Sequence, residues 1–479
     1  MEVTLESLTP GSPPSIEEPN HPVTSPRPSS DHPASEDQPL LSDEDRTTDT
    51  ESTFETETYD SLGVEEEAVV SSSSWAAYVN VICVVAGSGI LGLPYAVKQG
   101  GWIALGLIVL SMLITLHTSV ILIKCLYYNK NSTGKRLSSY GDIGYAAFGN
   151  FGRYFLVGVF NNSLLIGVPI LFFILAGQSL DNIVEQIWDI KLGVRIWTVI
   201  SASIVAFPFV FMKTLKETVI LGVFGSATTF FTVIAIVVLS FVDLPNVVNS
   251  PNPPSHSMWA FTGFPVALAS ISFSFGGNNV FPHIEESMRN KKNWNLVVGL
   301  GLATCAAMYA LVAFAGYYVY GDNVMSPIYL NLPKGLVLTI ATLFMTVHVL
   351  TTAPIYLTTF AFETEKYLKI TRDFHSPLSE FALRALFRTS LIVLCTGIAV
   401  IVPFFGDFMS FLGALSTCAC VFVLPVVFYL KLFGWKTMSI WALLWNLFVV
   451  VVGVIACVIG SADAILALVR DFREMAVKH

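Results

Sequence analysis

Charge is what this sequence has least of. Only 13% of its 479 residues are charged, against about 25% in soluble proteins. Its net charge of −9 at pH 7 offers no basic surface to a nucleic acid. Hydrophobic residues make up 53% of the chain, and from roughly residue 75 onward apolar runs of the ~20 residues that span a bilayer recur. The sequence therefore excludes an ordinary soluble protein and predicts an all-α polytopic membrane protein embedded in a lipid bilayer.

Patterns that hold cofactors or catalyse reactions are also missing. The cysteines all lie inside apolar segments, at Cys83, Cys125, Cys305, Cys395, Cys418, Cys420 and Cys457. That placement predicts no disulfide framework, and Cys418 and Cys420 would point to opposite sides of a helix. The sequence contains no Ser/His/Asp arrangement, phosphate-binding loop or metal-ligand spacing. We therefore expect neither an enzyme nor a bound cofactor or metal.

Residues 1–70 form an acidic segment rich in Pro, Ser and Thr, with almost no aromatic residues. Such a composition cannot bury enough apolar surface to fold, so it predicts a disordered cytosolic tail. Within it, Glu36 precedes the pair Leu40 and Leu41 by four positions. This spacing resembles the dileucine sorting signal that clathrin adaptors bind, although a long acidic tail can contain Leu-Leu by chance. A sorting signal here would direct the protein to endosomes, lysosomes or vacuoles.

Eleven apolar segments follow, which we expect to be transmembrane helices. Their approximate bounds are 75–97, 103–126, 154–178, 196–212, 218–242, 259–285, 295–319, 335–361, 382–402, 406–430 and 438–463. Lys and Arg are concentrated in the connections on one side, and the other side holds only Lys98, Lys191, Arg195 and Lys334. The positive-inside rule then places the N-terminus in the cytosol and, after an odd number of spans, the C-terminal tail 464–479 in the lumen.

Two of these segments share an interruption. Gly87-Ser-Gly89 breaks the first span, and Gly276-Gly-Asn-Asn279 breaks the sixth. Glycine can also serve close helix packing, but interrupted helices at matching positions of two halves indicate the binding site of an inverted-repeat transporter. Within a transporter domain at 71–463, we therefore predict repeats at about 75–242 and 259–430, followed by one extra helix at 438–463.

Backbone chemistry at the two breaks suits an amino acid. A helix that restarts offers unpaired N–H groups to a carboxylate, and a helix that stops offers unpaired carbonyls to an ammonium group. Spans three, eight and ten would supply the side-chain pocket. The candidate donors are Ser88, Gly89 and Ile90, the candidate acceptors are Val85, Ser274 and Phe275, and Gly87, Gly276 and Asn278 complete the predicted substrate-binding set.

Ionisable residues inside the membrane are candidates for ion coupling. His348 lies deep in span eight beside Thr351, and histidine can change charge near neutral pH. Glu285 lies at the cytosolic end of span six, where the alternative is an interfacial charge cluster with Arg289. Neither break has an Asp or Glu beside it, so a sodium site would have to use backbone carbonyls together with Asn80 and Thr351.

Four stretches carry a family resemblance. Residues 87–102 (GSGILGLPYAVKQGGW) and 275–288 (FGGNNVFPHIEESM) resemble the first-helix and sixth-helix motifs of the amino acid/auxin permease family, and residues 122–127 and 402–413 are also similar to it. The similarity extends over roughly 75–463 and is greatest to the branch of vacuolar amino acid transporters and the vesicular inhibitory amino acid transporter.

The resemblance implies a LeuT-like fold of eleven helices, amino acid substrates, a proton gradient as driving force and the membrane of an acidic organelle. Together with the breaks, it predicts a secondary active transporter that works by alternating access in a vacuolar, lysosomal or other acidic vesicle membrane. A sodium-coupled symporter, an amino acid sensor that signals through its N-terminal tail, and a channel are the alternatives.

Overall fold

The computed structural model describes residues 73–128, 136–211, 218–370 and 374–478. The chain divides into Met1–Ala68 and Val69–His479, and every described residue belongs to the second unit. The predicted tail at 1–70 and its sorting signal at Glu36, Leu40 and Leu41 lie outside the described residues. Across the described ranges the regular structure is helical, without a β-strand, which confirms the all-α prediction.

The first half of the unit begins with an interrupted helix. Its elements are α2 (Ser74–Val85), the 3-10 helix η1 (Ser88–Gly92), α3 (Leu93–Gly100), α4 (Ala104–Leu126), α6 (Tyr140–Asn150), the π-helix η2 (Phe151–Val157), α7 (Gly158–Trp188), α8 (Val194–Phe211) and α9 (Thr218–Val248). The start of α6 is fixed by a capping box, in which Ser139 and Asp142 each accept the other's backbone N–H. Gly149, at φ 62, then supplies the left-handed residue that turns the chain into η2 and α7.

The second half begins with the other interrupted helix. Its elements are α10 (Phe264–Ser274), α11 (Phe281–Ser287), α12 (Trp294–Tyr320), α13 (Leu336–Tyr367), α14 (Pro377–Ile401), α15 (Phe405–Leu412), the π-helix η7 (Gly413–Val423), α16 (Leu424–Phe433) and α17 (Ile440–Lys478). Short 3-10 turns lie at Phe261–Gly263, Lys291–Asn293, Gly321–Asn323, Ile328–Leu330 and Trp435–Thr437.

Long apolar helices dominate because, in lipid, a helix satisfies its own backbone hydrogen bonds. Nine helices in the described part are long and apolar enough to cross a membrane, and α2 with the segment Ser88–Gly100 makes a tenth span bent by 43°. The helix α10, with 11 residues, is too short to qualify alone, so the count of eleven is not confirmed. The last helix, α17, runs on to Lys478, past the predicted end of the final span at residue 463.

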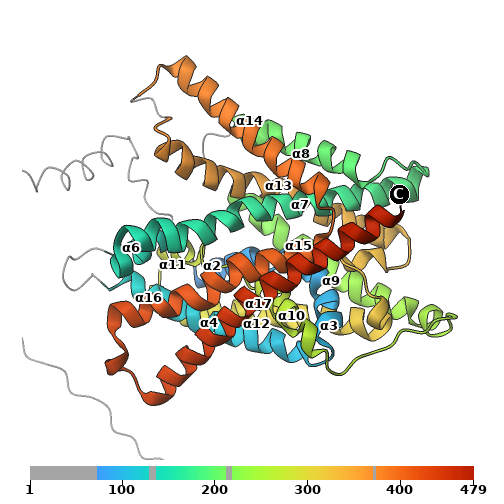
Figure 1. The fold of residues 1–479 in the computed structure, drawn as a ribbon, viewed down its shortest axis with the longest axis horizontal. Helices are drawn as coiled ribbons and strands as arrows, with labels where there is room; N and C mark the ends of the chain where they lie inside the picture. The colour runs from blue at the N-terminus through green and yellow to red at the C-terminus, as the bar shows by residue number, and fades with distance from the viewer. Residues whose placement is uncertain (1–72, 129–135, 212–217, 371–373, 479) are drawn as a thin grey trace, which may run out of the picture. The chain divides into compact units, whose positions relative to one another are not determined.

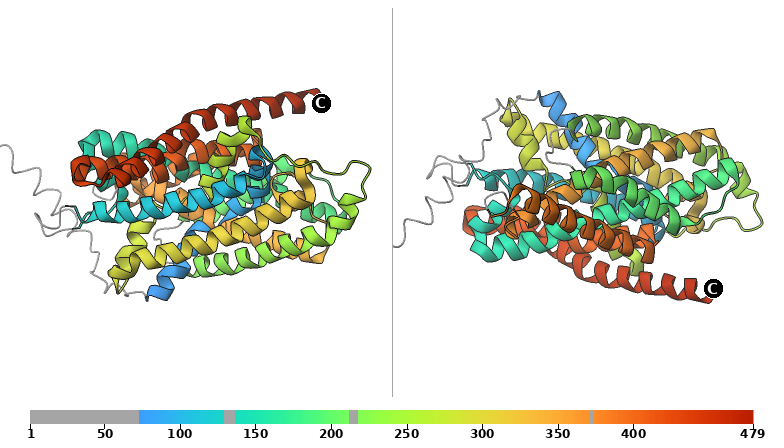
Figure 2. Two further views of the ribbon diagram at one scale, coloured as in Figure 1. Left: turned by 90° about the horizontal axis from the view of Figure 1, so that it is seen from below. Right: turned by 90° about the horizontal axis from the view of Figure 1, so that it is seen from above.

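The two interrupted helices pack against each other inside the bundle, where α10 contacts α3 and η1, and α11 contacts α2. The helix α7 packs along α13 and α8, and α13 also packs against α9, as can be followed in Figure 1. The helix α12 contacts α2, α3 and α9, whereas α10 contacts α3, η1, η7 and α17. Both views of Figure 2 show α17 along the outer side of the bundle. On one side the interrupted helices face α12, and on the other side residues of α7, α13 and η7 lie close to both of them.

Candidate functional site

The first break exposes backbone donors. The helix α2 ends at Val85, and the chain resumes helically only at Ser88. The N–H of Gly87 donates to the Val85 carbonyl at 3.0 Å, and that of Ile90 to the Gly87 carbonyl at 3.4 Å. Within the described residues, no hydrogen bond uses the N–H groups of Ser88 and Gly89. Two of the three predicted donors are therefore unpaired, and the third is already engaged.

The second break is a pair of turns. The helix α10 ends at Ser274, and the N–H of Gly276 donates to the carbonyl of Phe273 at 3.0 Å. A second turn closes where the N–H of Val280 donates to the carbonyl of Gly277, also at 3.0 Å. The helix α11 then starts with a proline in its first turn, where a missing N–H costs nothing.

A cavity of about 50 Å³ lies between the two breaks, which is room for a few water-sized molecules. Its lining consists of Val84, Val85, Gly87, Ser88, Gly89, Leu164, Val168, Phe172, Phe273, Ser274, Gly276, Tyr356 and Thr417, none of which is charged. The side chains that α7, α13 and η7 contribute correspond to the predicted spans three, eight and ten. The rings of Phe172 and Tyr356 meet edge-on with centroids 6.1 Å apart. The Thr417 hydroxyl, in a residue 1% exposed, is buried and has no partner among the described residues.

Six of the nine predicted substrate-binding residues line this cavity, namely Val85, Gly87, Ser88, Gly89, Ser274 and Gly276. The side chains of Ile90 and Phe275 lie in the hydrophobic core instead. Asn278 is fully buried, and its side chain bonds elsewhere. Its Oδ1 accepts from the Ser119 hydroxyl at 2.9 Å, and its Nδ2 donates to the Val421 carbonyl at 3.4 Å. Asn278 thus ties the second break to α4 and η7.

One residue at the breaks was missed from the sequence. The hydroxyl of Tyr309, on α12, lies 2.7 Å from the Val85 carbonyl oxygen and 2.6 Å from the Ser274 carbonyl oxygen. Tyr309 is buried, and its ring packs edge-on against Phe275 at 5.0 Å. The sequence offers only one indication of this role, a tyrosine hydroxyl within an otherwise apolar span. A buried tyrosine hydroxyl needs a hydrogen-bond partner.

The ion-coupling candidates lie away from the cavity lining. His348 is buried, and its Nδ1 has no partner within the described part of the chain. Its ring packs against Gly225 of α9 so closely that an added Cβ there would lie 2.3 Å from the ring. The Thr351 hydroxyl lies 2.9 and 3.0 Å from the backbone carbonyl oxygens of Val347 and His348, on its own helix. Asn80 lies in α2, more than one turn before the break.

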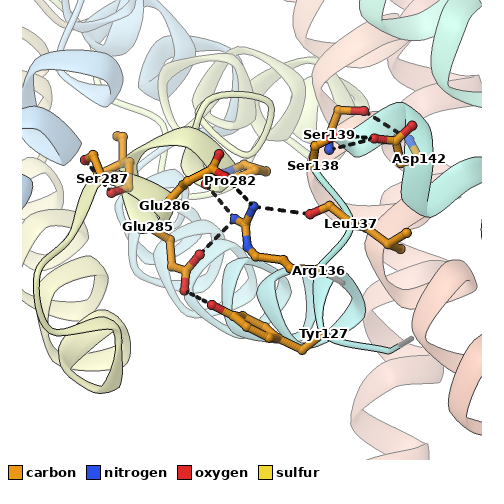
Figure 3. A network of polar contacts seen from close by, with 11 residues as sticks. Tyr127, Arg136, Leu137, Ser138, Ser139, Asp142, Pro282, Glu285, Glu286 and Ser287 are labelled. Carbon is orange, nitrogen blue, oxygen red and sulfur yellow. Dashed lines mark hydrogen bonds and ion pairs between the residues drawn. The ribbon is translucent and has the colours of Figure 1, made fainter. Parts of the chain in front are cut away.

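Glu285 lies in the last turn of α11 and belongs to a buried network of hydrogen bonds and ion pairs (Figure 3). Its carboxylate, 1% exposed, accepts from the Tyr127 hydroxyl at 2.6 Å and from Arg136 at 2.8 Å. The same Arg136 nitrogen also donates to the Pro282 carbonyl at 2.8 Å. Arg136 comes from the connection before α6, a partner that the predicted cluster around Arg289 did not include.

A bundle of apolar helices in which two interrupted helices share one cavity defines a class of protein, the membrane transporters. The sequence profile of the family described as "Transmembrane amino acid transporter protein" matches residues 70–466, so this chain belongs to that family. The family resemblance is thereby confirmed, and the family consists of membrane transport proteins rather than enzymes.

Two similar proteins are amino acid transporters of Arabidopsis thaliana. The chain is 30% identical to amino acid transporter AVT1I over 386 residues, which cover 78% of this chain and 90% of that protein. It is 29% identical to amino acid transporter AVT1H over 424 residues, covering 85% and 93% respectively. Amino acid transport across a membrane is therefore the function that family membership supports.

The solved structure of MhsT in complex with L-phenylalanine is similar in fold. Its TM-score is 0.54 at 13% sequence identity, over 82% of this chain and 99% of that one. At this identity the similarity speaks for the fold alone, and it confirms the LeuT-like architecture.

Proposed function

We propose that this protein is a proton-coupled secondary active transporter that binds an amino acid between its two helix breaks. One observation carries the proposal: the unpaired N–H groups of Ser88 and Gly89, and the terminal residues Val85 and Ser274 of two half-helices, border the same cavity. N–H groups at a helix start attract a carboxylate, and carbonyls at a helix end accept from an ammonium group. The buried Thr417 hydroxyl is a further polar group that faces this cavity without a partner among the described residues.

An uncharged lining suits a zwitterion. With no charged side chain around the cavity, neither end of a bound amino acid would be repelled. The substrate side chain would then meet the apolar groups of Leu164, Phe172 and Tyr356. Because the cavity of about 50 Å³ has room for only a few water-sized molecules, substrate entry requires the lining to move, as alternating access demands.

Proton coupling is supported by the position of His348. Its ring packs on Gly225, whose carbonyl accepts from the Thr229 hydroxyl at 2.9 Å. The same hydroxyl lies 3.2 Å from the carbonyl oxygen of Ala86 in the first break. A charge gained at His348 would therefore arise three contacts away from the break. The organelle membrane is supported by the predicted sorting signal, and imaging the tagged full chain beside organelle markers tests it.

Gly87→Ala tests the proposed site. A Cβ added at Gly87 meets nothing within 4 Å, so the methyl group would enter the open cavity without disturbing its walls. In proteoliposomes we expect KM to rise about tenfold, equivalent to about 1.4 kcal/mol, with normal insertion. Gly106→Ala is the matched control, because a Cβ there is equally free but lies on the exposed side of α4. Unchanged kinetics in Gly87→Ala would place the substrate elsewhere.

His348→Gln tests the coupling ion in the same vesicles. With internal and external pH varied independently, wild-type uptake should follow the proton gradient and persist when sodium is replaced. His348→Gln should keep substrate binding and lose the dependence on the gradient, because glutamine cannot become charged. His117→Gln is the control, since the His117 Nε2 is already paired with the Asn446 Oδ1 at 2.9 Å. Uptake that requires sodium would instead support a sodium-coupled symporter.

A further inference from the structure

The terminal carbonyls of both half-helices converge on one hydroxyl group. Val85 is the last residue of α2 and Ser274 the last of α10. The Tyr309 hydroxyl lies 2.7 Å from one carbonyl oxygen and 2.6 Å from the other. A single side-chain atom is thus within hydrogen-bonding distance of the ends of two helices that lie far apart in the sequence.

One hydroxyl cannot satisfy both carbonyls at once. A tyrosine hydroxyl carries a single hydrogen, whereas each carbonyl oxygen can accept two hydrogen bonds. The Val85 oxygen also accepts the N–H of Gly87 at 3.0 Å. The Tyr309 hydrogen can therefore be donated to the Val85 or the Ser274 carbonyl oxygen but not to both. The other carbonyl keeps a free acceptor position at a buried site, where an acceptor without a hydrogen bond is costly.

A primary ammonium group fits this arrangement. It carries three N–H donors on one atom, so it can donate to both carbonyl oxygens at once. A hydroxyl has only one donor, and water has two but is uncharged, so its hydrogen bonds are weaker than those of an ammonium group. Both Val85 and Ser274 line the cavity, so the group would approach from there. Tyr309 does not line the cavity and would act only through the two carbonyls.

We propose that Tyr309 is a positioning residue for transport, whose hydroxyl holds the Val85 and Ser274 carbonyls within reach of one substrate ammonium group. The inference rests on the proposed site between the breaks. It adds that recognition of the amino end depends on a residue of α12, outside both interrupted helices. The ring of Tyr309 packs on Phe275 at 5.0 Å, so removing the hydroxyl leaves the packing in place.

The first test is a cycle of two proteins and two ligands. The full-length protein and Tyr309→Phe are reconstituted, and inhibition constants are measured for L-leucine and L-phenylalanine and for 4-methylpentanoate and 3-phenylpropanoate, which lack the amino group. We expect Tyr309→Phe to weaken the amino acids at least tenfold and the analogues less than twofold. A loss of packing alone would weaken both classes equally or neither, and either result would overturn the inference.

Tyr140→Phe is the matched control. Tyr140 is also buried, and its hydroxyl donates to one backbone carbonyl, that of Cys420, at 2.7 Å, away from the cavity lining. It should leave the ratio between amino acid and analogue unchanged. If Gly87→Ala has no effect, the site itself is misplaced. If Gly87→Ala weakens binding while Tyr309→Phe leaves the ratio intact, only the role of Tyr309 is refuted.

A second measurement needs no variant. In the wild-type protein, N-methyl-leucine retains two N–H donors and N,N-dimethyl-leucine retains one. If two carbonyls must be reached together, the first should bind within about threefold of leucine and the second at least tenfold more weakly. Equal binding of leucine and its dimethyl derivative would overturn the inference even if Tyr309→Phe failed to fold.

Discussion

The two helix breaks differ in how the rest of the protein holds them. At the first break, Gly87-Ser-Gly89 faces the cavity, Thr229 of α9 reaches the Ala86 carbonyl, and the Tyr309 hydroxyl reaches the Val85 carbonyl. At the second break, Asn278 bonds to α4 and η7, and Asn279 donates to the Asn161 Oδ1 of α7 at 2.7 Å. The half-helix beyond it is bound by Tyr127 and Arg136 (Figure 3).

This difference shows two ways to interrupt a membrane helix. A break made of glycine and serine leaves backbone groups free, and in a membrane those groups must face a cavity or a ligand. A break that carries asparagines can satisfy itself through amide side chains that bond to neighbouring helices. In the proposed site, the first break is therefore suited to meet a ligand, and the second to fix one wall of the cavity.

Gly89→Val should have the largest effect on transport, because it affects the contact between the two breaks. A Cβ at Gly89 would lie 2.6 Å from the Ser274 Oγ and 3.0 Å from the Ser274 Cα. The two half-helices would have to separate, which misaligns donors and acceptors together. We expect proteoliposome uptake to fall by about two orders of magnitude, a loss near 2.8 kcal/mol.

Gly106→Val provides the reference for Gly89→Val, since a Cβ at Gly106 has no neighbour within 4 Å. Both variants should reach the membrane in equal amounts, measured by size-exclusion chromatography of the detergent-extracted protein. Full uptake by Gly89→Val would mean that transport does not require the first break to approach Ser274. The proposed difference in function between the two breaks would then be refuted.

Among the effects on stability, that of Arg136→Ala should be the largest. It would leave the Glu285 carboxylate, 1% exposed, without its cation. Removing one partner of a buried ion pair costs about 3 kcal/mol. Thermal unfolding in detergent should therefore show a clearly lowered midpoint, because α11 loses the Arg136 bonds to both Pro282 and Glu285.

Glu286→Gln is the matched control for Arg136→Ala. Glu286 contacts the same guanidinium at 3.5 Å but is 47% exposed, and an exposed ion pair contributes about 0–1 kcal/mol. Its midpoint should stay close to the wild-type value. Equal shifts in the two variants would show that the second break is not anchored through Glu285.

The length of the apolar runs and the positions of the glycines predict the fold and the two breaks, whereas the partners of polar side chains could not be predicted. Lipid forces spanning segments into helices, so the α-helical class and the two breaks could be predicted from local sequence. The six cavity-lining residues at the breaks followed because the break itself fixes where the backbone is exposed. The far end of α17 did not follow, because its helix continues to Lys478 beyond the apolar run.

Contacts that depend on helix rotation or on distant partners were not predictable. The place of Asn278 in the break predicts a contact with the substrate, yet its side chain turns toward α4. Tyr309 is one of 16 tyrosines, and nothing in its neighbourhood marks it as the one facing both breaks. Arg136 is separated from Glu285 by 149 positions, and no local pattern joins them.

Thr229→Val should have the smallest effect and measures how loosely the first break is held. The Thr229 hydroxyl has one hydrogen and lies closer to the Gly225 carbonyl, at 2.9 Å, than to the Ala86 carbonyl, at 3.2 Å. Valine keeps the shape, so we expect a loss near the ~0.6 kcal/mol average of hydrogen bonds between membrane helices. Asn278→Ala, which removes bonds to both α4 and η7, should lower the thermal midpoint several times more. If Thr229→Val destabilises as much as Asn278→Ala, the first break is anchored as firmly as the second, and its free N–H groups cannot be attributed to loose attachment.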